Sequence, residues 1–388
     1  MEWYTLDSAL RRDSVIEEYA SFIWTERYSA FGDFQIVTRS TYNNRQQLAT
    51  GTRIAMKGSY RVMTVDTVAD DTGLDGTRNI TVTGKSLESL LDDRVAMPAM
   101  QNTTVAPNWV ITERPATIVR QMFAIICVNG ALDPRDSIPF YTGGQLLPSG
   151  SIPEPPDAVT ITSTPGTLYA AIKAICDTYG LGFRLVRNGE LGQIFFEVYT
   201  GNDLTADQTS RNPVIFDPSL DNLEKISQLT STALVKTVAY VFAANGTKVV
   251  YAPTANQAGS GSDRRVLLVS SSNNLPAGPA LDLALTQEGI QALAKQQTVY
   301  SFDGQLPQMI PYVYGRDYNL GDLVEERNSD GFGNQMVVTE QIFVSDNTGE
   351  RAYPTLTLNQ AIVPGTWLSE DPNDTWSTVD PTETWSTA

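Results

Sequence analysis

The sequence first shows its plan in the run Phe22-Ile23-Trp24-Thr25-Glu26-Arg27-Tyr28, which leads through Gly32 into Asp33-Phe34-Gln35-Ile36-Val37. Three aromatic residues and Glu26 fall on one side of the first run, and the second run resumes the alternation. A period of two with aromatic and β-branched residues is typical of a strand, and the intervening glycine favours a turn. The two runs therefore predict a β-hairpin with one aromatic face buried, near the start of a β-rich domain.

The chain has the composition of a folded protein and, at 388 residues, is long enough for two or three domains. No run approaches the roughly 20 apolar residues that a membrane-spanning helix needs. Residues 1–7 lack the basic start and apolar core of a signal peptide. We therefore expect the protein to be made and folded in the cytoplasm.

Charge and composition disfavour two classes of function. The formal net charge of −17 argues against nucleic-acid binding, because a phosphate backbone needs Lys and Arg, and Arg11-Arg12 and Arg264-Arg265 are only pairs. The chain contains no histidine, which removes Ser-His and Cys-His nucleophile pairs, His metal sites and His general bases. Chemistry by carboxylates, Lys or Tyr stays open, so an enzyme is disfavoured without being excluded.

The two cysteines, Cys127 and Cys176, each lie inside an apolar helical pattern. A cysteine in such a place is typically a small buried hydrophobic residue, and disulfides are rare in cytoplasmic proteins. We interpret both as buried free thiols.

The first third predicts a β-meander. After a polar lead-in over residues 6–19, strands are expected at 60–68 and 79–84, joined by an acidic loop over 70–76. A helix is expected over 85–95, with Ser86 as its N-cap.

The middle of the chain predicts two helices, over 115–130 and 165–180, each with Pro near the start and Gly at the end. Their similar spacing has two explanations that both stay open: an internal duplication, or a coincidence between two amphipathic helices. A hairpin is expected around Asn188-Gly189.

The last third returns to strands. Hairpins are expected around Asn245-Gly246 and Asp346-Asn347-Thr348-Gly349, a strand over 312–324, and a helix over 285–297. The fold class is therefore α+β and β-dominated. The expected domains are 1–112 (β with a short helix), 113–218 (α+β), 219–364 (β with a helix) and an extended tail, 365–388.

The tail repeats a Thr-Trp pair every nine residues, at Trp367, Trp376 and Trp385. Little else in it is apolar, so it cannot build a core. We interpret the three indoles as docking groups that fill pockets of a partner, because exposed Trp is otherwise disfavoured. The alternative is a disordered terminus with accidental repetition.

Two acidic groups could in principle carry chemistry. Asp70, Asp71 and Asp75 could gather Ca²⁺, but the spacing is not that of an EF-hand. Asp317, Asp322, Glu325 and Glu326 could pair as catalytic carboxylates, but strand alternation spreads them over both faces. No phosphate-binding glycine motif is present. We expect no catalytic residue, no metal and no cofactor.

Four segments, taken in order, resemble a known family, the minor tail proteins or baseplate hubs of long-tailed phages of actinobacteria. These landmark segments are residues 22–34, residues 80–94 (Ile80-Thr81-Val82-Thr83-Gly84 and the helix pattern after it), residues 199–205 (Tyr199-Thr200-Gly201-Asn202-Asp203-Leu204-Thr205), and residues 316–340. The last of them begins Arg316-Asp317-Tyr318-Asn319-Leu320-Gly321-Asp322 and closes on Val338-Thr339-Glu340.

The resemblance implies a hub at the tail tip, similar to the hubs of contractile phages, with two tail-tube-like β-barrel domains and intervening α+β segments. It implies a homotrimer that meets the distal tail protein ring, the tail tube and the tape measure protein, assembled in the host cytoplasm and located in the virion. The Trp tail would attach another tail-tip or receptor-binding protein.

Two other functions stay open. A receptor- or carbohydrate-binding tail protein would use the periodic Trp residues to stack on sugars, although such platforms normally lie on a rigid scaffold. A tail-associated cell-wall hydrolase would need a catalytic domain, and the landmarks leave no spare domain for one.

Overall fold

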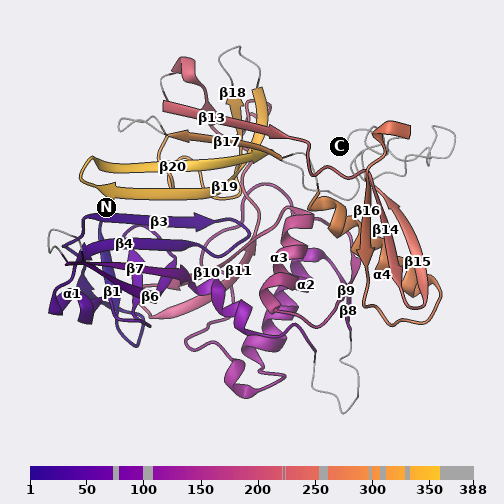
Figure 1. The fold of residues 1–388 in the computed structure, drawn as a ribbon, viewed down its shortest axis with the longest axis horizontal. Coiled ribbons are helices and arrows are strands. Elements are labelled where there is room, and N and C mark those ends of the chain that lie inside the picture. The colour runs from indigo at the N-terminus through magenta and orange to yellow at the C-terminus, as the bar shows by residue number, and fades with distance from the viewer. Residues whose placement is uncertain are drawn as a thin grey trace.

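A computed structural model describes residues 1–72, 78–98, 108–220, 222, 224–252, 261–296, 299–305, 312–327 and 333–358. Strands dominate, with a few helices packed beside them, as the predicted β-dominated α+β class requires (Figure 1).

One 13-stranded sheet runs through the N-terminal and C-terminal thirds of the chain. In spatial order the strands of its main path are β13 (Glu224–Ser231), β17 (Val299–Gln305), β20 (Gly349–Leu358), β19 (Gly333–Asp346), β3 (Ser21–Arg27), β4 (Asp33–Arg39), β7 (Arg78–Ser86), β6 (Val62–Thr72), β5 (Arg53–Met56), β1 (Trp3–Leu6) and β2 (Arg12–Val15). Off this path, β18 (Leu323–Arg327) pairs with β19 and with β12 (Ile215–Phe216).

The opening hairpin is confirmed as β3 and β4, and Phe22, Trp24, Phe34 and Ile36 are buried between them and the neighbouring strands. Trp3 stacks on Phe22 with ring centroids 4.0 Å apart. This aromatic core explains the period of two, because side chains on one face of a strand alternate with those on the other.

The seam of the sheet is the antiparallel pairing of β3 with β19, seven residue pairs from Arg27 with Glu340 to Ser21 with Asp346. It joins segments more than 300 residues apart, side by side in Figure 1. The main path ends at β2 and β13, so the described residues form an open sheet and not a closed barrel. The domain limits at 112, 218 and 364 stay a prediction, although this sheet unites strands from the first and third segments.

The middle of the chain forms its own apolar core beside the sheet. Its elements are the pair β8 (Trp109–Glu113) and β9 (Val159–Ser163), α2 (Pro115–Phe123) continued by a π-helix (Ala124–Val128), α3 (Leu168–Tyr179), and the hairpin β10 (Gly182–Asn188) and β11 (Gln193–Tyr199). Cys127 and Cys176 lie in this core, both free and buried, as expected. Gly180 ends α3 in the left-handed conformation at φ 66°.

A smaller unit follows, made of a three-stranded sheet and a helix. Its elements are β14 (Val238–Ala243), β15 (Gly246–Tyr251), β16 (Val266–Ser270) and α4 (Pro279–Ala294). The Asn245-Gly246 hairpin is confirmed. The remaining helices are short: α1 (Tyr42–Gln47) and 3-10 helices at Leu87–Asp93, Pro134–Asp136, Pro218–Leu220 and Gly261–Asp263.

Three local predictions were wrong, and one helix was missed. The polar lead-in over residues 6–19 contains the last residue of β1 and all of β2, because an edge strand such as β2 carries polar residues on its solvent side. α1 was not predicted. Asp70 lies in β6, which runs to Thr72, and not in a loop. The segment before β18 is a series of turns, in which Gly315 and Gly321 have φ of 83° and 88°.

The helix predicted over 85–95 forms as a 3-10 helix with Ser86 at the N-cap position, but the Ser86 side chain makes no capping hydrogen bond. Its hydroxyl instead accepts a hydrogen bond from the backbone N–H of Gly32, at 2.8 Å. Ser86 therefore binds the turn of the opening hairpin.

Candidate functional site

The predicted site residues do not form a site in the described chain. Trp367, Trp376 and Trp385 lie outside the described residues, as does Asp75. Asp70 pairs with Arg45 and Arg78. Within the ranges the structure describes, no three His, Cys, Asp or Glu side chains are placed to hold a metal ion.

The second acidic group is also dispersed. Asp317 pairs with Arg316, and Glu325 pairs with Arg327. Asp322 is buried and accepts hydrogen bonds from backbone and side-chain groups. These carboxylates therefore serve separate local contacts and do not face one another as a catalytic pair.

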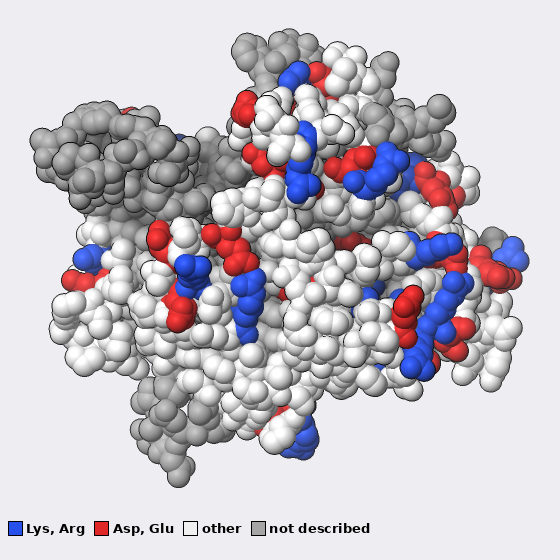
Figure 2. Space-filling model, turned by 180° about the vertical axis from the view of Figure 1, so that it is seen from behind, with Lys and Arg blue, Asp and Glu red and all other residues white. Residues whose placement is uncertain are grey.

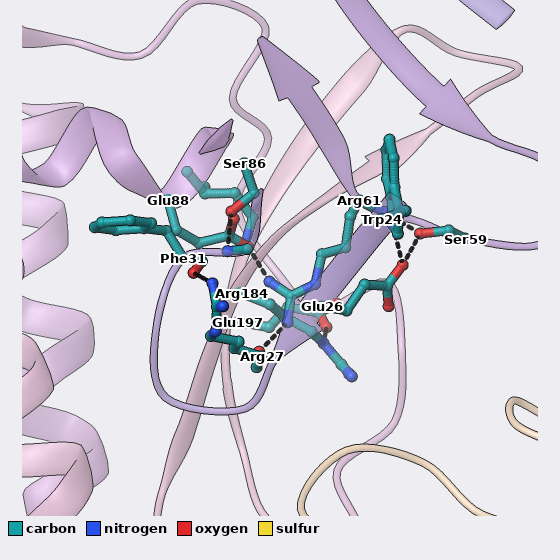
Figure 3. Close-up of polar contacts among 12 residues, drawn as sticks. Trp24, Glu26, Arg27, Phe31, Ser59, Arg61, Ser86, Glu88, Arg184 and Glu197 are labelled. Carbon is teal, nitrogen blue, oxygen red and sulfur yellow. Dashed lines mark hydrogen bonds and ion pairs between the residues drawn. The ribbon is translucent and has the colours of Figure 1, made fainter. Parts of the chain in front are cut away.

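A different feature connects three parts of the fold: the N-terminal strands, the central core and the C-terminal strands. It is a largely buried cluster that we call the polar junction. It consists of Glu26, Arg27, Tyr28, Ser59, Arg61, Glu88, Arg184, Glu197, Tyr314, Asp322 and Glu340. Figure 3 shows its central contacts, between the N-terminal part of the 13-stranded sheet and the β10–β11 hairpin.

The pair Arg61 and Glu88 lies at the centre of the polar junction, and their side chains are 6% and 0% exposed. The same Glu88 oxygen that receives the Arg61 guanidinium accepts the backbone N–H of Leu185 at 2.7 Å. Arg61 also donates to the carbonyl oxygen of Arg27 at 3.1 Å. A buried charge is costly unless it is paired, so this arrangement fixes the first sheet against β10.

Glu26 carries the contacts from the opening hairpin to the C-terminal third. Its carboxylate accepts hydrogen bonds from the Trp24 indole at 3.0 Å, from the Ser59 hydroxyl, and from the Tyr314 hydroxyl at 3.0 Å. Burial, and then the nearby Glu26 charge, raise the pKa of Tyr314 well above its ordinary value. The phenol therefore stays protonated and remains a donor to Glu26.

Tyr28 is in contact with all three parts of the chain. Its hydroxyl lies 2.9 Å from the carbonyl oxygen of Gly180 and 3.2 Å from that of Tyr199. Its backbone N–H donates to the carbonyl of Thr339 at 2.9 Å. A Cβ atom on Gly182 or on Gly321 would lie 2.2 or 2.3 Å from its ring. Both glycines are therefore needed for the ring to fit.

Three further ion pairs flank the centre. Arg27 pairs with Asp33 of its own hairpin and with Glu340 of β19, so it fastens the seam. Arg184 pairs with Glu197 at 2.7 Å, and its guanidinium lies 3.8 Å from the centroid of the Tyr199 ring. Cation–π contact and charge pairing together hold the guanidinium in a fixed orientation.

Asp322 closes the junction on the C-terminal side. One oxygen accepts the backbone N–H of Asn202 at 2.6 Å, and the other accepts that of Asn319 at 2.7 Å. Burial raises the pKa of Asp322 above its ordinary value. A Cβ atom on Gly201 would lie 1.8 Å from the carbonyl oxygen of Gly321, so the two backbones touch directly.

The four landmark segments of the sequence therefore meet in one place. Residues 22–34 supply Glu26 and Tyr28, residues 80–94 supply Glu88, residues 199–205 supply Asn202, and residues 316–340 supply Asp322. The charged groups are engaged with one another or with backbone amides. Such an arrangement can fix segments in place.

One feature of the sequence indicates this junction, the position of Glu26. Glu26 lies on the same side of its strand as Phe22, Trp24 and Tyr28, and a carboxylate on a buried face needs donors nearby. Arg61 carries no comparable signal, because its partner Glu88 is brought to it only by the pairing of β6 with β7.

One face of the molecule gives little support to an extended charged site. On the face shown in Figure 2, Lys and Arg lie next to Asp and Glu over a mostly uncharged surface. No helix in the described ranges is long and apolar enough to cross a lipid bilayer.

Comparison with known proteins gives a family and a fold. A family model described as Siphovirus ReqiPepy6 Gp37-like protein matches residues 2–353. A search of curated proteins finds no match.

Two solved structures share the fold over nearly the whole chain. A tail protein from Neisseria meningitidis MC58 is 15% identical, with a TM-score of 0.53, and the match covers 94% of this chain and 97% of that one. The 43 kDa tail protein of prophage MuSo2 from Shewanella oneidensis is 12% identical, with a TM-score of 0.55, over 92% and 98% of the two chains. At these identities the likeness establishes the fold alone.

Proposed function

Because this chain belongs to the family of Siphovirus ReqiPepy6 Gp37-like tail proteins, we propose that it is the baseplate hub at the tail tip of a long-tailed phage. In this role it joins the distal tail protein ring and the tail tube to the tail-tip components during assembly and host entry. It works as a structural part, without catalysis of its own.

The observation that carries the proposal is the seam between β3 and β19, held by the polar junction. A hub must keep a constant shape while neighbouring rings load it, and buried ion pairs at the meeting point of three parts oppose relative movement. The central charges of the junction are buried and paired, which suits a scaffold.

We further propose that the chain assembles as a homotrimer with two tube-like units per chain. One unit comprises the strands from β3 to β2, and the other comprises β19, β20, β17, β13, β18 and β12. Three chains would then present six similar units to a hexameric ring. In the main path of the described sheet, β2 and β13 are the two end strands, each paired on one side only, and such edges can pair between chains.

The first test is the mass of the assembled protein. The proposal predicts that three copies of this chain, about 127 kDa or three times the 42.4 kDa of one chain, contribute to the mass of the complex with the distal ring protein. Light scattering after size-exclusion chromatography measures it. A stable monomer that also fails to bind the ring protein would overturn the proposal.

The periodic Trp residues favour a second candidate, a receptor- or carbohydrate-binding tail protein. In that case, phage lacking residues 366–388 should assemble complete tails but no longer adsorb to the host. Complete tails with normal adsorption would count against this candidate and leave the hub role as proposed.

A further inference from the structure

Among the described residues, one face of the three-stranded sheet of β15, β14 and β16 is covered and the other is uncovered. α4 packs on the covered face, where Leu285 and Leu293 contact Val241 and Val250 within one apolar cluster. A Cβ atom on Gly289 of α4 would lie 2.5 Å from Val250, so the helix and the sheet are in close contact there.

The uncovered face is apolar where a one-sided sheet normally presents polar residues to water. The strand register places Tyr240 between Val249 and Leu268, in one row across the three strands. Phe242, Tyr251 and Val266 share the same face by alternation. We call the following set the outer face: Tyr240, Phe242, Val249, Tyr251, Val266 and Leu268.

Most of this outer face is open to solvent, with Leu268 68% exposed and Val249, Tyr251 and Phe242 each more than 40% exposed. Contiguous exposed apolar surface of this kind marks a binding surface. Its end near the start of β14 is cationic. The Arg264 guanidinium lies 5.9 Å from the Tyr240 ring centroid and 5.7 Å from that of Tyr251, and Arg265 is exposed beside it.

The chain leaves the large sheet within reach of this cationic end. Near its C-terminal end at Leu358, β20 pairs with β17, with Thr357 opposite Ser301. Five residues before Ser301, the carbonyl of Gln296 accepts the backbone N–H of Lys236 at 3.0 Å. Lys236 is two residues before β14, so Leu358 lies within roughly 35 Å of the start of β14, by the reach of an extended chain.

The segment that follows has the chemistry to cover this surface. Residues 366–388 hold three Trp and five Asp or Glu, and no Lys or Arg. Trp367 is nine residues beyond Leu358, a reach of roughly 30 Å, and Trp376 and Trp385 are farther along the chain, so the indoles can come to the outer face. Indoles pack well on exposed aliphatic and aromatic side chains, and the acidic residues complement Arg264 and Arg265.

We propose that residues 366–388 bind the outer face of the β14–β15–β16 sheet of their own chain, through the indoles of Trp367, Trp376 and Trp385. The Trp repeat is then an internal cover for an apolar surface. This inference does not depend on the hub role, since it rests on the face, the tail and the distance between them.

Cysteine cross-linking of the full-length chain tests the proposal directly. Leu268→Cys combined with Ser377→Cys places one thiol on the outer face and one beside Trp376. The native thiols do not interfere, because Cys127 and Cys176 are buried. We expect mild oxidation to give a disulfide within one chain, seen as a reducible increase in gel mobility.

The matched control is Leu191→Cys with Ser377→Cys, since Leu191 is an equally exposed leucine at the turn of the β10–β11 hairpin. The control should give no such species. Disulfides between two chains at position 268, or equal yields at 268 and 191, would overturn the proposal.

Fluorescence quenching by acrylamide provides a second readout without engineered thiols. Trp3, Trp24 and Trp109 are buried, so a change in quenching reports the other three of the six indoles. In the variant Val249→Glu with Leu268→Glu, we expect the quenchable fraction to rise from a low level to about half, because three of the six indoles lose their shielding and become accessible. The control Leu191→Glu should leave quenching unchanged. Equal quenching in wild-type protein and the face variant, with circular dichroism unchanged, would contradict the proposal.

Discussion

Tyr28 fills its surroundings so completely that two glycines are required beside it. Gly321 has φ of 88°, and a Cβ atom there would also meet the Tyr28 ring. Gly315 offers a matched control, with φ of 83° and no atom within 4 Å of such a Cβ. The two positions therefore share the backbone cost of an alanine and differ in the steric cost.

We predict that Gly321→Ala lowers the free energy of unfolding by about 1–3 kcal/mol more than Gly315→Ala does, which is the usual cost of overpacking. Urea denaturation of both variants measures the difference. Equal losses would mean that the ring has room to move and does not hold the three parts together.

Removing one partner of the buried pair should be more costly. Glu88→Gln leaves Arg61 charged and buried, and we predict a loss of about 3–5 kcal/mol of unfolding free energy. Lys173→Ala is the control, because Lys173 and Asp177 form an exposed pair on α3 that contributes only about 0.3–0.5 kcal/mol. A Glu88→Gln variant as stable as the control would show that the junction is dispensable.

The thiols give a prediction that depends on pH. Burial raises the pKa of Cys127 to about 12 and also raises that of Cys176. Because the thiolate is the reactive form, neither thiol should react with a disulfide reagent at pH 8 in the folded protein, and both should react in denaturant. Fast reaction of one thiol in the folded state would contradict the burial of these helices.

At the scale of elements, the seam should be as protected as the interior of the first sheet. β3 bonds to β4 on one side and to β19 on the other. We predict that amides of β3 that donate to β19 exchange with deuterium as slowly as those that donate to β4. The reason is that the two sets of hydrogen bonds belong to one cooperative unit and break together when it unfolds. The edge strand β16 serves as the fast-exchanging reference. Faster exchange on the β19 side would mean that the N- and C-terminal thirds open independently.

The hairpins were predictable from sequence because their information is local. β3–β4 and β19–β20 each combine alternation with a short turn, and both form. β1 and β2 escaped prediction because four-residue strands give too few alternations. The segment over 312–322 alternates like a strand but turns, because Asp317 accepts the N–H of Val313 and closes the chain locally.

The candidate site was much less predictable. Glu26 showed that donors must lie nearby, but the donor Tyr314 is 288 residues away and reaches it only through the seam. The landmark segments could be recognised in the sequence, yet nothing local to them indicated that they converge. Their meeting point is a property of the topology and not of any one segment.

In the whole molecule, buried charges lock one open sheet and one central core together, which makes the protein a rigid scaffold. We propose that this scaffold is the hub of a phage tail tip. Rigidity alone does not distinguish a hub from other tail proteins, so position and symmetry in the particle must do so.

Cryo-electron microscopy of the intact phage tail is the strongest test of the hub role. We expect three copies of this fold around the tail axis at the tip, directly below the distal ring, with the β3–β19 seam intact in each. Density for this fold away from the axis, on a fibre, or repeated along the tail tube would contradict it.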